Sequence, residues 1–305
     1  MPPALSVEIA GLRLSNPVIA SSGTFGYGIE FSPLVDLNRL GGLVVKGLSL
    51  EPMDGAPAPR VCETASGMLN AVGLQNIGVR AFLAEKMPLL RSFRTAVVAN
   101  IFGSTVEEYA QVIQILEDAE GLAAYELNIS SPNAKQGGLH FGRDPVTAAE
   151  VVAVARRAAV KRRLWVKLSP LTADIALMAR AVTEAGADVL TIANTYPAMS
   201  LDPASRQSRL GRPTGGLSGP AIKPITLRLV YEASKAVKTP ILGLGGIETA
   251  DDILEYLLAG ATAVQVGTAH FVDPRASERL VASLESRCSE LSISNINDIR
   301  SSFHA

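Results

Sequence analysis

The fold is decided by residues 240–268, PILGLGGIETADDILEYLLAGATAVQVGT. A short apolar run at 240–244 is followed by two glycines and then by residues 250–258, whose apolar spacing is typical of a helix. An Ala-Gly-Ala sequence ends this helix, as glycine commonly does, and leads into a second apolar run at 263–266. Continuous rather than alternating apolar residues indicate strands covered on both faces. The stretch therefore predicts two parallel strands joined by a helix.

The same kind of apolar run occurs in eight places along the chain. These runs lie at residues 17–21, 42–47, 96–102, 124–130, 164–168, 188–193, 240–244 and 263–266. Helical patterns separate most of them, at residues 106–116, 146–159, 173–184, 219–237 and 250–258, with another from 272 onward. Eight parallel strands alternating with helices predict an α/β fold, the (β/α)8 TIM barrel, as a single domain over residues 1–305. An open doubly wound sheet usually has a Gly-x-Gly-x-x-Gly turn after its first strand, and residues 22–26 lack that spacing.

Several segments lie outside the strand–helix alternation. Residues 7–14 alternate around a glycine and predict an N-terminal hairpin that closes the bottom of the barrel. Three long connections, at 49–79, 131–143 and 194–217, are expected over the C-terminal face, where long loops are usually functional. The connection at 131–143 is rich in glycine and is expected to act as a lid, with an ordinary surface loop as the alternative.

The beginnings of two helices also have sequence signals. Residues 104–107 resemble a capping box before the helix that starts at residue 106. Asp144 is expected to be the N-cap residue of the next helix, with Pro145 at its first position.

The composition excludes several classes of protein. Lys and Arg total 28 against 29 for Asp and Glu, a net charge of −1, which leaves no excess of positive charge for a nucleic-acid backbone. The apolar runs are far shorter than a membrane span, and the first residues show no signal-peptide pattern, so a cytoplasmic protein with no membrane contact is expected. Two cysteines are too few for an iron–sulfur cluster in one chain, and the three histidines show no ligand spacing, so no metal site is expected.

Polar residues and glycines end almost every predicted strand, where a barrel of this kind places its reacting groups. They are Ser22, Lys46, Asn100, Asn128, Lys167, Asn194, Gly245-Gly246 and Gly267-Thr268. Polar residues also end strands simply because they meet solvent there, but two lysines within apolar strands imply an anion at the mouth. Glycine pairs after the seventh and eighth strands lie where such barrels commonly bind phosphate.

Asparagines point to a second kind of ligand. Asn70, Asn128, Asn133 and Asn194 each offer a carbonyl acceptor and an amide donor, which suits a neutral ring whose edge has both C=O and N–H groups, such as a pyrimidine-like imide. A purely structural use in turns is the alternative for Asn70, Asn76 and Asn133.

These residues lie within motifs that resemble the dihydroorotate dehydrogenase family, from about residue 5 to residue 290. The motifs are 15–26 (SNPVIASSGTFG), 45–47 (VKG), 70–76 (NAVGLQN), 126–133 (ELNISSPN), 165–170 (WVKLSP), 193–195 (ANT), 215–220 (GGLSGP) and the two glycine-containing pairs. Residues 135–138 (KQGG) and the SGTFG sequence most resemble the NAD-linked class 1B catalytic subunit.

The resemblance implies a flavin and a substrate in the barrel mouth. The residues expected to hold FMN are Ser22, Lys46, Gly47, Asn100, Asn128, Lys167, Ala193, Gly219, Gly245, Gly246, Gly267 and Thr268, with the phosphate on the last two pairs. The residues expected to bind dihydroorotate and its product orotate are Lys46, Asn70, Ala71, Val72, Gly73, Leu74, Asn128, Asn133, Asn194 and Thr195. Lys46 would face the substrate carboxylate and take part in catalysis.

Ser131 departs from the class 1 pattern. Class 1 members have a cysteine base within Asn-x-Ser-Cys-Pro-Asn, and here serine stands in its place. Serine is usual in the membrane-linked class 2 enzymes, but the N-terminal membrane-associating helices of that class are not expected here. The base takes a proton from substrate C5 while hydride leaves C6 for flavin N5, and a thiol becomes a base far more easily than a hydroxyl. Ser131 is thus expected either to need activation by hydrogen bonding or to work slowly; a natural serine variant, an introduced Cys→Ser change and a weakened protein all remain open.

Class 1B enzymes are complexes with a second subunit that contains FAD and a [2Fe–2S] cluster and reduces NAD⁺. Because this chain has neither cluster ligands nor a dinucleotide motif, NAD⁺ reduction is expected on such a partner. The resemblance implies a homodimer of catalytic chains within a heterotetramer. Two alternatives stay open: a class 1A-type homodimer that passes electrons to fumarate, and a flavin-binding barrel that has lost its activity and serves as a scaffold.

Overall fold

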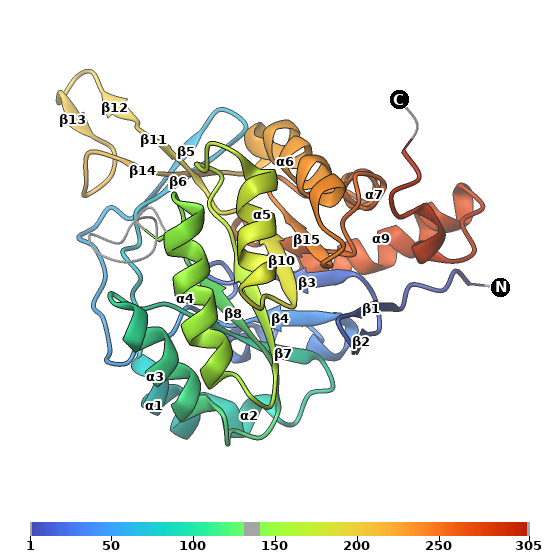
Figure 1. Cartoon of the computed structure of the whole chain (residues 1–305). Helices are drawn as coiled ribbons and strands as arrows, with labels where there is room; N and C mark the ends of the chain where they lie inside the picture. The colour runs from blue at the N-terminus through green and yellow to red at the C-terminus, as the bar shows by residue number, and fades with distance from the viewer. Residues whose placement is uncertain (1, 131–140, 304–305) are drawn as a thin grey trace.

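The computed structural model describes residues 2–130 and 141–303, and its centre is a closed barrel of eight parallel strands (Figure 1). In sequence order the barrel strands are β3 (Val18–Ala20), β4 (Gly42–Val44), β7 (Ala96–Ile101), β8 (Leu122–Asn128), β9 (Arg163–Lys167), β10 (Val189–Ile192), β15 (Ile241–Leu244) and β16 (Ala263–Val266). Sequence neighbours pair throughout, and β16 closes the barrel against β3. Each of the eight apolar runs contains a barrel strand or overlaps one, so the predicted (β/α)8 barrel is confirmed.

Helices surround the barrel and bury its outer face (Figure 1). They are α1 (Gly78–Ala81), the continuing turn Phe82–Lys86, α2 (Met87–Leu90), α3 (Val106–Leu116), α4 (Pro145–Ala158), α5 (Ile175–Glu184), α6 (Lys223–Ala236), α7 (Ala250–Leu258), α8 (Ala269–Val272) and α9 (Ala276–Glu290). Between β3 and β4 there are only two short 3-10 turns, Ile29–Phe31 and Leu37–Arg39; two more, Pro220–Ile222 and Ile296–Ile299, precede α6 and follow α9. The strands are buried on both faces because helices lie outside and side chains fill the inside, which explains their continuous apolar sequence.

The N-terminal hairpin lies at the bottom of the barrel, as the sequence predicts. Strands β1 (Val7–Ile9) and β2 (Leu12–Leu14) pair antiparallel, and Val7 and Ile9 are buried in the main core. Residues of β2 line one hollow together with Ala96 and Leu122, which begin β7 and β8, so the hairpin lies at the N-terminal ends of the barrel strands.

The two long connections at 49–79 and 194–217 contain regular structure that the sequence analysis did not predict. Together they form a four-stranded antiparallel sheet in the order β11 (Tyr196–Ala198), β14 (Gly215–Ser218), β6 (Gly67–Asn70) and β5 (Val61–Thr64). A small hairpin, β12 (Leu201–Asp202) with β13 (Gln207–Ser208), extends from it. Figure 1 shows these strands grouped at the end of the barrel opposite the β1–β2 hairpin and both chain termini. This sheet forms one wall of the C-terminal mouth.

Of the two predicted helix beginnings, the one at α4 is confirmed, whereas α3 starts at residue 106 as predicted but has its N-cap one residue later than expected. Asp144 accepts a hydrogen bond from Thr147 N at 2.8 Å and Pro145 opens α4, as predicted. At α3 the N-cap is Thr105, which accepts from Glu108 N, whereas Ser104 supplies a backbone N–H to the Glu108 carboxylate. The capping box predicted at 104–107 is therefore wrong by one position, because either hydroxyl could cap and the extended Thr105 backbone places its own hydroxyl there.

No helix within residues 2–130 and 141–303 is both long enough and apolar enough to cross a membrane.

Candidate active site

A cavity of about 1160 Å³, counting its open mouth, lies at the C-terminal end of the barrel. Most of the residues predicted to bind a ligand line it: Ser22, Lys46, Gly47, Asn70, Val72, Leu74, Asn100, Asn128, Lys167, Ala193, Asn194, Thr195, Gly219, Gly245, Gly246, Gly267 and Thr268. These residues come from all eight barrel strands or the loops after them and from the overlying sheet. A closed parallel barrel brings them together because the carboxyl ends of all its strands meet at one rim.

Two lysines give the cavity positive charge. Lys167 ends β9, is 4% exposed, and its Nζ lies 3.4 Å from Ser22 Oγ. Lys46 follows β4, and burial lowers its pKa to about 8, with further lowering from the nearby charges of Lys167 and Arg60. Burial also lowers the pKa of Lys167, while the Glu126 carboxylate opposes that shift. Neither ammonium forms an ion pair with a carboxylate in the described part of the chain. Two such cations lining one cavity suit an anionic ligand.

Backbone, rather than side chains, forms the wall at the ends of β15 and β16. Gly246 has φ of +68°, and a Cβ there would lie 2.8 Å from Gly219 O and from Lys223 Cβ, so only glycine fits this turn. Thr268 follows Gly267 after β16, and its hydroxyl donates to Ser218 Oγ of β14 at 2.7 Å. Glycine turns of this kind let a phosphate approach backbone N–H groups closely.

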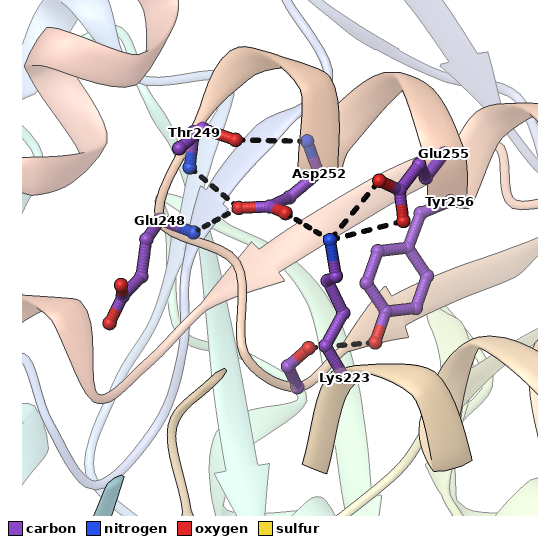
Figure 2. A network of polar contacts seen from close by, with 7 residues as sticks. Lys223, Glu248, Thr249, Asp252, Glu255 and Tyr256 are labelled. Carbon is purple, nitrogen blue, oxygen red and sulfur yellow. Dashed lines mark hydrogen bonds and ion pairs between the residues drawn. The ribbon is translucent and has the colours of Figure 1, made fainter. Parts of the chain in front are cut away.

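A polar network behind the Gly245-Gly246 turn holds it in place (Figure 2). Asp252 of α7 accepts hydrogen bonds from the backbone N–H groups of Glu248 and Thr249, at 2.9 and 2.8 Å, and contacts Lys223 Nζ of α6 at 2.5 Å. Tyr256, one turn further along α7, donates its hydroxyl to Gly245 O at 2.7 Å. Burial alone would raise the pKa of Asp252, but Lys223 and the backbone donors outweigh it and lower the pKa below 3.8. The network thus joins α6 and α7 directly under the glycine turn.

Replacing Asp252 by alanine is expected to lower the free energy of unfolding by about 2–4 kcal/mol, because two backbone N–H groups lose their partner and Lys223 loses one of its two carboxylate partners, keeping only Glu255. The depressed pKa means that this stabilisation is present above pH 3.8 and is lost as the pH falls below it. Urea denaturation at pH 7 and below pH 3.8 measures both effects.

The neighbouring residue Asp251 provides a matched control, because its ion pair with Arg287 is largely exposed. Asp251→Ala is expected to change the unfolding free energy by less than about 1 kcal/mol. Equal losses in the two variants would contradict the structural role given to Asp252.

Amide side chains form the third feature of the cavity. Asn100 is the penultimate residue of β7, Asn128 ends β8, and Asn194 follows β10. Asn128 Nδ2 lies 3.5 Å from Asn100 Oδ1, and Asn194 reaches Ser130 Oγ at 3.0 Å, so the three amides form a connected row. Asn70 ends β6 in the overlying sheet, and its side chain donates to Gly216 O at 3.2 Å. Asn70 therefore has a structural hydrogen bond and also lines the cavity.

Two predicted substrate residues lie behind the cavity wall. Ala71 is fully buried and its N–H donates to Arg60 O at 2.7 Å. Gly73 has φ of +74°, and a Cβ there would lie 2.5 Å from Ala56 N. Both residues shape the loop that brings Val72 and Leu74 to the cavity. The Asn76 side-chain amide donates to Ser49 Oγ and to Leu74 O. Asn76 therefore has the structural role in a turn that the sequence analysis gave as an alternative.

Ser131, Asn133 and most of the expected lid lie outside the described residues, so the structure leaves those predictions as they stand.

Some lining residues were not predicted. They are Ser21, Gly23, Thr24, Met68, Ser218, Ile222, Leu244, Ile247, Glu248, Ala269 and Phe271. Ser21, Gly23, Thr24 and Ser218 lie within the motifs that carry the family resemblance, so the signal was present. Met68 and Phe271 had no signal, because an apolar residue in a loop or short helix reads as ordinary packing.

These features fit FMN. The glycine turns after β15 and β16 offer a cradle for a phosphate, and two lysines without carboxylate partners in the described chain offer charge for a phosphate or an electron-rich ring. The described residues contain no group of three or more His, Cys, Asp or Glu side chains that could hold a metal.

Comparison with known proteins agrees with the sequence motifs. The family model for dihydroorotate dehydrogenase matches residues 4–288. A Trichlorobacter lovleyi protein named dihydroorotate dehydrogenase B (NAD(+)), catalytic subunit, is 53% identical over 98% of both chains. A protein of the same name from Pelobacter propionicus is 51% identical over 98% of both chains. A Solibacter usitatus protein, with the provisional name dihydroorotate dehydrogenase A (fumarate), is 56% identical over 93% of both chains. The chain therefore belongs to the dihydroorotate dehydrogenase family.

Proposed function

We propose that this chain is an FMN-dependent enzyme that oxidises (S)-dihydroorotate to orotate in pyrimidine biosynthesis, working as a single domain over residues 1–305. The observation that carries the proposal is one cavity lined by Lys46, Lys167, three asparagines and both glycine-containing pairs, in a chain of this family. A scaffold that had lost its activity would have no need for this whole set.

The cavity residues divide by chemistry into two groups. We propose that Gly245-Gly246 and Gly267-Thr268 hold the FMN phosphate, and that Lys167 and Ser22 lie against the ring system. FMN, when bound, supplies at N5 the acceptor for the hydride that leaves substrate C6. Gly47, Asn100, Ala193 and Gly219 complete the proposed flavin site.

The substrate is proposed to lie beside the flavin. Lys46 would bind its carboxylate, and the amides of Asn70, Asn128, Asn133 and Asn194, with Thr195, would bind the ring C=O and N–H groups. Ser131 would take the proton from C5 as the C5–C6 double bond forms. Oxidation at C6 and deprotonation at C5 together balance the loss of two hydrogens.

Electrons are proposed to leave through a separate subunit to NAD⁺. Two relatives reported above are named as NAD⁺-linked catalytic subunits, and this chain has only two cysteines, too few to hold an iron–sulfur cluster alone. We propose that the partner contains FAD and a [2Fe–2S] cluster and that two catalytic chains assemble with two partners as a heterotetramer.

The alternative of a homodimer that passes electrons to fumarate is kept as a second candidate, because the name of the Solibacter usitatus relative includes fumarate. Acceptor assays distinguish the two. The FMN-loaded chain should form one orotate per flavin and then stop when given NAD⁺ or fumarate alone, and should turn over with NAD⁺ once a class 1B partner is added. Sustained turnover of the isolated chain with fumarate would favour the homodimer; no orotate with any acceptor, even after Ser131→Cys, would reject the proposed function.

Orotate binding is expected to depend on pH through Lys46. Its pKa of about 8 means that the ammonium is charged below pH 8 and loses its proton above it. The Kd of orotate should therefore be constant between pH 6 and 7 and should rise above pH 8. The rise should approach about tenfold in Kd per pH unit. Titration of the flavin absorbance with orotate measures this, and a Kd unchanged up to pH 10 would contradict the role given to Lys46.

A further inference from the structure

A fully buried carboxylate, Glu126, lies within the barrel just below the cavity. It is on β8 two residues before Asn128, so both side chains point to the barrel interior. Its Oε1 accepts from Asn100 Nδ2 at 2.8 Å, and its Oε2 accepts from Thr191 Oγ1 at 2.8 Å and from Gln265 Nε2. All of these donors are neutral. Glu126 does not line the cavity, so it acts through its neighbours.

A series of hydrogen bonds connects Glu126 to the amides of the cavity, and in each bond the donor is the group farther from Glu126. Asn128 Nδ2 donates to Asn100 Oδ1 at 3.5 Å, and Ser130 donates to Asn128 Oδ1 from its hydroxyl at 2.9 Å and its backbone N–H at 3.3 Å. Asn194 Nδ2 then donates to Ser130 Oγ at 3.0 Å. We call Asn100, Asn128, Ser130 and Asn194 the amide chain. Every donor in the amide chain points toward Glu126.

The two ends of the amide chain fix this direction. At one end, Asn100 Nδ2 donates to Glu126 Oε1 at 2.8 Å, so the Asn100 NH₂ group faces Glu126. A backbone N–H can only donate, and Thr195 N donates to Asn194 Oδ1 at 2.8 Å, which turns the Asn194 NH₂ group toward Ser130. Asn128 is held by Ser130 N. The amide of Asn100 is oriented from both sides, by Glu126 Oε1, which accepts from its Nδ2 at 2.8 Å, and by the longer contact from Asn128 Nδ2 to its Oδ1 at 3.5 Å.

We propose that Glu126 is a positioning residue that determines which atoms of the active-site amides face the ligands. If Asn100 turned over, its NH₂ group would face the NH₂ group of Asn128, and one of the two would have to move. The amides that are proposed to bind the flavin and the ring of orotate would then present a donor where an acceptor is needed. A site built on hydrogen bonds loses much of its discrimination when one group is mismatched. This inference rests on the proposed function.

The test compares orotate with benzoate, which has the ring and carboxylate but no ring C=O or N–H group. Glu126→Leu removes the acceptor, and we expect the ratio of benzoate Kd to orotate Kd to fall about tenfold or more. A general loosening of the site would weaken both ligands alike and leave the ratio unchanged. Both Kd values come from titration of the flavin absorbance, with FMN content and thermal unfolding measured for each variant.

Two further variants control for charge and burial. Gln265→Leu removes a donor to the other oxygen of Glu126, and it should leave the ratio within about threefold while lowering stability. The double variant Glu126→Gln with Gln265→Glu moves the carboxylate to position 265 but keeps a carbonyl that can accept from Asn100, so it should also keep the ratio. This second variant decides the question if Glu126→Leu does not fold.

The inference would be overturned if folded Glu126→Leu kept the benzoate-to-orotate Kd ratio of the unmodified chain. It would also be overturned if this ratio fell in the folded double variant. Failure of the unmodified FMN-loaded chain to bind orotate would instead reject the proposed function, so the two failures are distinguishable.

Discussion

Replacing Ser131 by alanine is expected to lower kcat for dihydroorotate oxidation by about 10²- to 10⁴-fold, the usual contribution of a positioned general base. The KM for dihydroorotate should change little, because the carboxylate and ring contacts proposed for Lys46 and the amides remain. The rate of flavin reduction under anaerobic conditions measures this step directly. FMN content and orotate Kd serve as controls that the site is intact.

Ser131→Cys should change the rate in the opposite direction. A thiol with an ordinary pKa of about 8.5 loses its proton far more easily than a hydroxyl, so flavin reduction near neutral pH should become faster. The gain should rise with pH up to about 8.5 and then level off. A Ser131→Ala variant that reduces its flavin at the unmodified rate would show that Ser131 is not the base.

Replacing Lys46 by methionine is expected to raise the Kd of orotate by about 10- to 100-fold, since a charge-assisted hydrogen bond in a buried site is lost. Methionine keeps the length and apolar packing of the side chain, so the fold should be preserved. The dependence of orotate binding on pH above 8 should disappear in the same variant, because the titrating group is gone.

Lys235→Met is the matched control, because Lys235 lies exposed on α6 and its Nζ contacts only the Tyr231 ring among the described contacts. It should bind orotate like the unmodified chain. Equal affinity in the Lys46→Met and Lys235→Met variants would contradict the proposed carboxylate contact.

The barrel could be predicted from sequence because its signal is local. Each strand is buried on both faces, so residues such as 241–244 form an unbroken apolar run that ends at a glycine turn. The sheet over the mouth gave no such signal. Strand β5 alternates between exposed and half-buried residues over only four positions, and β6 pairs with β14, which lies about 150 residues later in the chain. Non-local pairing of short strands leaves no periodicity to read.

The candidate site could be predicted to a similar extent. Lysines, asparagines and glycines at strand ends are conspicuous, and the closed barrel brings them to one cavity. Ala71 and Gly73 were expected to contact the substrate but lie behind the wall, because a motif gives positions along the chain and not the direction in which they face. For Glu126, the sequence analysis noted only that it begins the motif at 126–133 and predicted no role for it. Its role depends on Asn100, Thr191 and Gln265, three donors from three other strands.

A crystal structure of the chain with FMN and orotate tests most directly whether one cavity holds both molecules. The predicted result places the FMN phosphate within hydrogen-bond distance of the backbone at Gly245-Gly246 and Gly267-Thr268, and the orotate carboxylate at Lys46. Orotate ring atoms should meet the amides of Asn128 and Asn194. A flavin phosphate bound elsewhere, or orotate bound away from Lys46, would contradict the assignment of this site.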